Sequence, residues 1–205
     1  MILTPIDPDR LPPMLDTFAA SLAADSLART VFARIAATRR FCVDLTADLH
    51  AGRHKAIALA ARLGIPTRDE DPAVAFSWDG QVIRTRSETS VVFHEIAHWQ
   101  VAPPSRRSVL DFGLGVGPES GRVNEANAAV CTDAAIQEEE ENLASLLGIL
   151  WETEYGEPAI LAFAEQNWLE LYDRPSTAQH FVRCLHALAA RGLINGDGRP
   201  QVAAG

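Results

Sequence analysis

The sequence has few of the features of a secreted or membrane protein. Its three cysteines, Cys42, Cys131 and Cys184, are widely spaced and form no C-x-x-C pair, so neither a disulfide framework nor a zinc knuckle is indicated. The first residues lack a basic segment followed by an apolar one. No uninterrupted apolar run approaches the roughly 18 residues that cross a bilayer. We therefore expect a cytoplasmic protein with no membrane partner.

Basic residues are also scarce relative to acidic ones. The chain carries 18 Lys and Arg residues against 27 Asp and Glu residues, a formal net charge of −9. A surface that binds nucleic acid needs clustered Lys and Arg to neutralise phosphates, so we expect no nucleic-acid partner. An acidic balance can instead attract a cationic substrate.

Hydrophobic periodicity predicts a helix-rich α+β fold in a single domain of residues 1–205. No stretch has the composition of an interdomain linker, and apolar residues recur at helical spacing in several segments. We expect helices over 15–37, 45–63, 91–100, 124–151, 158–171 and 178–190. Asp79-Gly80 lies between the apolar segments 74–78 and 81–84, which predicts a two-residue turn and a small antiparallel β element.

The helix over 91–100 carries the pattern His94-Glu95-Ile96-Ala97-His98. Two imidazoles four residues apart share one helix face and can bind one metal ion. Glu95 lies beside them, where it can act as a base toward metal-bound water or orient a ligand. The apolar neighbours of the pattern indicate a buried helix, in which such polar groups need partners. The alternative is a pair of hydrogen-bonded core histidines without a metal.

A third ligand is expected from the acidic run Glu138-Glu139-Glu140-Glu141. Glu140 falls three residues before Leu143 and seven before Leu147, on the buried leucine stripe of the helix, and Glu139 lies on its shoulder. Glu138 and Glu141 are expected to point away from that stripe. We therefore predict Glu140 as the third ligand, with Glu139 next. The alternative is a solvated acidic helix start that the helix dipole favours.

Two histidines and one carboxylate suit two chemistries. One is Fe(II) with dioxygen as cosubstrate, and the other is Zn²⁺ that activates water for hydrolysis. In a zinc hydrolase, Glu95 would be the general base. A metal-stabilised binding protein without catalysis is a third reading of the same residues.

Residues beyond this helix resemble a known family. After Trp99 the chain continues with Ser105-Arg106-Arg107-Ser108-Val109-Leu110-Asp111-Phe112-Gly113 and then Pro118-Glu119-Ser120-Gly121-Arg122. This order is similar to that of the elongation factor P hydroxylase family, in which H-E-I-[AS]-H-W is followed at the same distance by R-R-x-x-V-D-F-G and a P-D-G-R-like turn.

The resemblance implies an iron-dependent hydroxylase of the 2-His-1-carboxylate type, with Glu140 at the position of the family's central glutamate. In the characterised family the substrate is the β-lysylated lysine of elongation factor P. The implied partner is therefore elongation factor P, or another protein or small molecule that carries an amine. Leu114-Gly115-Val116-Gly117 stands where the family has an aromatic run, so a relative with another substrate is an alternative.

Other polar residues are candidates for a role at this site. Either Arg106 or Arg107 could pair with Asp111 and shape the cleft, or bind a carboxylate, and Asp111 could accept a hydrogen bond from a ligand imidazole. The alternatives are surface charge and a turn cap. His50 and His54 form a second pair four residues apart, but no carboxylate is placed beside them. His186 is expected to be a packed core histidine.

Overall fold

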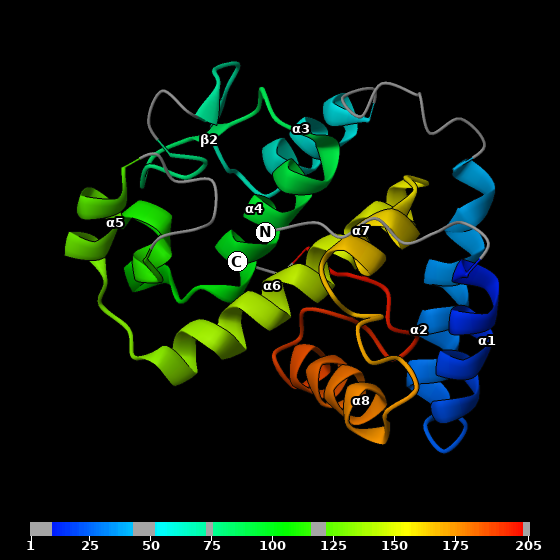
Figure 1. Ribbon diagram of the computed structural model, residues 1–205. Coiled ribbons are helices and arrows are strands. Elements are labelled where there is room, and N and C mark those ends of the chain that lie inside the picture. Colours follow the sequence, from blue (N-terminus) through cyan, green and yellow to red (C-terminus); the bar gives the residue numbers. More distant parts are fainter. Residues whose placement is uncertain (1–9, 43–51, 73–75, 116–121, 203–205) are drawn as a thin grey trace. The chain divides into compact units, whose positions relative to one another are not determined.

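The computed structural model describes residues 10–42, 52–72, 76–115 and 122–202. Contacts within the chain gather into two compact units. The central unit is Thr46–Gly148, and the terminal unit combines Ile2–Leu45 with Ile149–Gly205. The fold is rich in helices and has one two-stranded sheet in the described part of the chain, which confirms the helix-rich α+β class (Figure 1).

The central unit contains four helices and the two strands. They are α3 (Arg53–Arg62), β1 (Thr67–Arg68), β2 (Ile83–Arg84), α4 (Thr89–Val101), α5 (Val123–Ala129) and α6 (Ala134–Tyr155), which belongs to this unit through Gly148. Two short 3-10 helices, η3 (Pro104–Arg106) and η4 (Leu110–Gly113), follow α4. Helix α4 packs against α3 and β2, which places its apolar residues in the core of this unit.

The two strands pair in parallel, which corrects the antiparallel element expected from the sequence. Thr67 is the partner of Ile83, and Arg68 is the partner of Arg84. The chain does reverse at Gly80, which has a φ of 86°, and the Asp79 carboxylate accepts hydrogen bonds from Gln81 N and Val82 N. The reversal spans four residues between Trp78 and Ile83 rather than the two that were predicted. Among the described residues of this segment, Trp78 and Ile83 form an antiparallel bridge, and β1 is the strand that pairs with β2.

The terminal unit is built around four phenylalanine rings. Its elements are α1 (Leu11–Ser21), α2 (Ser26–Ala37), η1 (Thr38–Phe41), α7 (Ala159–Glu165), α8 (Pro175–Ala190) and the end of α6 from Ile149. Phe18, Phe32, Phe163 and Phe181 are at most 2% exposed, and the ring centroids of every pair lie 4.9 to 6.5 Å apart. Such a cluster supplies both apolar burial and favourable edge-to-face contacts.

Several predicted helices are interrupted where a polar side chain caps the next one. The helix expected over 15–37 is α1 and α2, and Asp25 begins α2 by accepting a hydrogen bond from Ala28 N at 2.8 Å. The helix expected over 124–151 is α5 and α6, and Asp133 caps α6 by accepting from Ile136 N at 2.9 Å. The helix expected over 158–171 ends at Glu165, and residues 45–51 of the helix expected over 45–63 lie outside the described residues.

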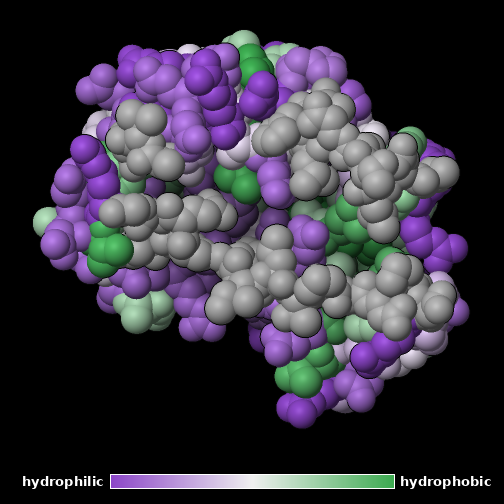
Figure 2. Space-filling model, turned by 45° about the horizontal axis from the view of Figure 1, so that its top comes forward, coloured by the Kyte–Doolittle hydropathy of each residue, from purple (hydrophilic) through white to green (hydrophobic). Residues whose placement is uncertain are grey.

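Hydrophilic residues are the most common among the described residues on the face that Figure 2 shows, and apolar residues are exposed there in separate groups. Among the described helices, none is both long and apolar enough to cross a membrane.

Candidate metal centre

Helix α4 brings His94 and His98 together on one face. The rings meet edge to face, with centroids 4.5 Å apart, and their Nε2 atoms lie 2.9 Å from one another. Both side chains are shielded, since 16% of His94 and 8% of His98 is exposed. The pair arises from the four-residue spacing, because one helical turn separates the two side chains along the axis.

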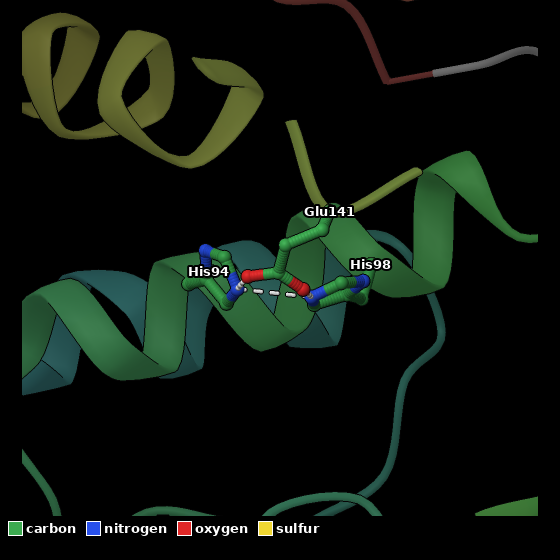
Figure 3. A group of neighbouring side chains, drawn as sticks. All are labelled: His94, His98 and Glu141. Carbon is green, nitrogen blue, oxygen red and sulfur yellow. Dashed lines mark hydrogen bonds and ion pairs between the residues drawn. The ribbon is translucent and has the colours of Figure 1, made fainter. Parts of the chain in front are cut away.

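The carboxylate of Glu141 lies between the two rings (Figure 3). Its Oε1 is 3.2 Å from His94 Nε2, and its Oε2 is 3.1 Å from His98 Nε2. These three residues are the one group of potential metal ligands that the described part of the chain brings together. The centre therefore joins two ligands from α4 to one from α6.

Glu141 takes the position that the sequence analysis gave to Glu140. The Glu140 side chain instead forms an ion pair with Arg106 and is 9% exposed. Glu139 and Glu138 are exposed residues. The structure thus brings Glu141, rather than the predicted Glu140, within metal-binding distance of the two histidines.

The close approach of α6 to α4 at Gly148 accounts for this difference. Gly148 follows Glu141 by seven residues, which places the two on the same face of the helix. A Cβ atom on Gly148 would lie 3.1 Å from the Cα of His94, so the backbones approach closely there. Ala144 and Ser145 lie between these two residues on the same side and are buried. In the sequence, the small residues on the face of Glu141 would have indicated the glutamate that meets the histidines, whereas the leucine stripe did not.

The protonation states at the centre suit a bound cation. Burial and the neighbouring ring of His94 lower the pKa of His98, because both disfavour a positive imidazole. Burial raises the pKa of Glu141, but the charges and hydrogen bonds of the two imidazoles outweigh this and hold that pKa well below its usual range. At neutral pH, His98 is then neutral and Glu141 ionised, which are the forms that bind metals.

The rings of Phe112 and Trp78 stack in sequence on the His98 ring. Phe112 stacks on His98 with centroids 5.6 Å apart, and Trp78 stacks on Phe112 at 5.4 Å. Phe112 and the preceding Asp111 both have positive φ, 55° and 41°, in the region that side chains other than glycine rarely adopt. Two consecutive residues in this conformation indicate a segment that its surroundings hold in place.

The remaining residues proposed for the site are placed as follows. Arg107 lies with its guanidinium carbon 3.8 Å from the centre of the Trp99 ring, and its Nε donates to Ala102 O at the end of α4. It therefore fastens the following loop to the ligand helix. Asp111 is half-buried, and its backbone N–H donates to Trp78 O at 3.2 Å. Glu95 is half-buried on α4.

The other histidines lie apart from this centre or outside the described residues. His186 is 58% exposed, and its Nε2 lies 2.7 Å from the Asp25 carboxylate, which corrects its expected position in the core. The pair joins α8 to the start of α2 within the terminal unit. His54 is exposed at the start of α3, and His50 lies outside the described residues.

No protein-family model, no curated protein and no solved structure matches this chain. The resemblance to the elongation factor P hydroxylases therefore stays a prediction that rests on the motif residues.

Proposed function

We propose that the protein is a mononuclear non-haem Fe(II) hydroxylase with His94, His98 and Glu141 as its protein ligands. The observation that carries this proposal is the convergence of two imidazoles and one carboxylate from two helices. Two histidines and a carboxylate that leave positions open are typical of Fe(II) enzymes that use dioxygen. The order of motifs after α4 supports the same class.

The separations between the donor atoms are compatible with binding of one metal ion. Two donors bound at about 2.1 Å from one ion lie roughly 3.0 Å apart at right angles and roughly 3.4 Å apart in a tetrahedron. The distance between the two Nε2 atoms is 2.9 Å, and the distances from each Nε2 to its nearer Glu141 oxygen are 3.1 and 3.2 Å. All three separations are short enough for one metal ion to bind both imidazoles and the carboxylate.

The bound iron would supply the activation of dioxygen for hydroxylation of a C–H bond. His94, His98 and Glu141 would hold that ion with three protein ligands, which would leave coordination positions for dioxygen and substrate. Phe112 stacks on His98 and keeps water from that side of the ring. Glu95, next to the ligands on α4, is proposed to orient ligands or move protons.

An amine is the substrate group that the surroundings support best. The exposed Glu138 and Glu139 precede the ligand Glu141 on α6, and the chain has a net charge of −9. A cationic amine is attracted to such a surface. We therefore propose a modified lysine of a protein such as elongation factor P, or another amine-bearing molecule. The three free cysteines favour a reducing compartment and hence the cytoplasm.

The metal content of protein purified anaerobically without a histidine tag tests this function. Wild type is compared with His94→Ala, Glu141→Gln and the matched control Glu138→Gln, whose side chain is exposed three residues earlier on α6. We expect close to one iron per chain in wild type and in the control, and loss of the iron in the other two variants. Removing one ligand from a site with three protein ligands lowers metal affinity steeply.

Nitric oxide then reports whether the iron has open positions for dioxygen. We expect the Fe(II) protein to bind nitric oxide and to give the paramagnetic resonance signal of a high-spin iron–nitrosyl centre. One zinc per chain in place of iron would overturn the hydroxylase and favour a hydrolase with Glu95 as base. Iron that binds no nitric oxide would equally exclude dioxygen activation at this centre.

A further inference from the structure

A buried ion pair lies next to the metal ligands without contributing one. Arg106, on η3, and Glu140, on α6, form this pair, and their side chains are 13% and 9% exposed. Among the described residues, Arg106 is the partner of the Glu140 carboxylate, whose Oε2 is buried without a hydrogen bond. Burying two charges is unfavourable unless their geometry is fixed by further contacts. A contribution to folding stability therefore does not by itself explain why Arg106 and Glu140 are buried here.

Arg106 also makes a second contact, to the segment that supports His98. Its Nη1 donates to Phe112 O at 2.9 Å, while its Nη2 binds Glu140. One planar guanidinium thus joins η4 to α6. The carbonyl that it binds belongs to a residue with a φ of 55°, so this hydrogen bond helps to hold the strained conformation.

Each end of this bridge acts on a different metal ligand. At one end, Glu140 directly precedes Glu141, so the ion pair fixes the turn of α6 that carries the Glu141 carboxylate. The close contact of Gly148 with His94 fixes the same helix seven residues later. At the other end, the ring of Phe112 lies on His98 at an interplanar angle of 18° and limits the rotation of that imidazole.

We propose that Arg106 is a positioning residue, which sets the Glu141 carboxylate and the His98 ring for metal binding by bridging Glu140 and the Phe112 carbonyl. The inference rests on the proposed metal centre, and it assigns to the first arginine of the Arg106-Arg107 pair a role that is distinct from substrate binding. Lysine at this position would keep the charge but would lose the planar fork that binds two acceptors at once.

Cobalt(II) is the probe for this proposal, because its visible absorption reports the geometry of its ligands. The full chain, freed of metal, is titrated with Co(II) alone, as wild type, Arg106→Gln, Arg106→Lys and Glu140→Gln. The matched control is Arg86→Gln, which removes an arginine from an exposed ion pair with Asp69. We expect a roughly 10- to 100-fold loss of Co(II) affinity and an altered visible band in the first three variants, of the size found for groups that support ligands. The control should be unchanged.

The double variant Arg106→Gln/Glu140→Gln separates positioning from stability. It leaves no unpaired buried charge, so its melting temperature should recover relative to Arg106→Gln. We expect its Co(II) affinity and band to stay altered, because a glutamine side chain is too short to bridge both elements. Recovery of the wild-type band and affinity together with the melting temperature would overturn the proposal.

Comparison of wild type with His94→Ala distinguishes failure of the proposed metal centre from failure of the proposed role of Arg106. A visible band in wild type that His94→Ala abolishes shows that Co(II) reports this centre. If wild type has no such band, the metal centre itself is wrong. If the band is present and Arg106→Gln binds Co(II) like wild type, the centre stands and the role of Arg106 is refuted.

Discussion

Gly148 of α6 lies directly against the backbone of His94 on α4. A Cβ atom at position 148 would come within 3.1 Å of His94 Cα and 3.2 Å of His94 N. This close approach lets the Glu141 carboxylate, seven residues earlier on the same face, reach both imidazoles. The position of one glycine therefore allows the close approach of the two helices that carry His94 and Glu141.

Gly148→Ala is expected to weaken the metal centre. An alanine inside a helix normally stabilises by roughly 1 kcal/mol relative to glycine. Here its methyl group meets backbone atoms that cannot rotate away, so α6 must shift from α4 and Glu141 moves with it. We expect a lower melting temperature and weaker Co(II) binding. Gly196→Ala, where a Cβ meets nothing within 4 Å, is the control. A Gly148→Ala protein more stable than wild type with unchanged Co(II) affinity would contradict this prediction.

Glu152→Gln is expected to stabilise the protein at neutral pH but not in acid. Glu152 is 3% exposed, and its Oε1 has no hydrogen-bond partner among the described residues. Burial, and then the charges of Glu157 and Glu165, raise the pKa of Glu152 well above its usual value of 4.5. The folded state therefore holds a proton that the unfolded state loses, so wild-type stability falls as pH rises from about 4.5 toward the raised pKa.

Denaturant unfolding between about pH 4 and about pH 8 measures this effect. The difference in unfolding free energy between Glu152→Gln and wild type should be near zero at the acid end and should grow in favour of the variant with pH. Glu170→Gln, which changes an exposed carboxylate, should show no such trend. A difference in unfolding free energy that is independent of pH would show that folding does not raise the pKa of Glu152.

Thr38→Val is expected to destabilise the terminal unit. The buried Thr38 hydroxyl donates to Ile35 O at 2.6 Å and accepts from Ile160 N at 3.0 Å, which ties the end of α2 to the start of α7. Valine has the same shape but leaves the Ile160 N–H without its acceptor, at a cost of about 1–3 kcal/mol. For a chain of this length, each 1 kcal/mol lowers the melting temperature by roughly 2–4 °C. Thr30→Val, at an exposed hydroxyl, should have a much smaller effect.

Leu171→Gly is expected to raise the melting temperature slightly. Leu171 has a φ of 55° and is 46% exposed, so it bears the strain of the left-handed region and gains little from burial. That strain is about 1–2 kcal/mol, against roughly 0.5–1 kcal/mol for the greater freedom of glycine in the unfolded chain. Leu171→Ala keeps the Cβ atom and should give no gain. Equal melting temperatures for the two variants would show that the backbone is not strained there.

The pairing of His94 and His98 could be predicted from the sequence, because the helix alone sets how the two residues lie relative to one another. A spacing of four residues on a helix with apolar neighbours places His94 and His98 on one face, whatever surrounds them. The helix-rich class was also predictable, since hydrophobic periodicity is local. The ends of the helices were harder to predict, because capping residues such as Asp25 and Asp133 begin a new helix within an otherwise continuous hydrophobic pattern.

The tertiary structure decided which glutamate joins the histidines. Four consecutive glutamates differ only in their direction around α6, and the leucine stripe pointed to Glu140. The contact of α6 with α4 runs through Gly148 instead, and this rotates Glu141 toward the ligands while Glu140 meets Arg106. Likewise, only long-range pairing revealed that β2 lies parallel to β1. The sequence by itself determined what is set within one helix, whereas contacts between segments far apart in the chain depend on how those segments pack.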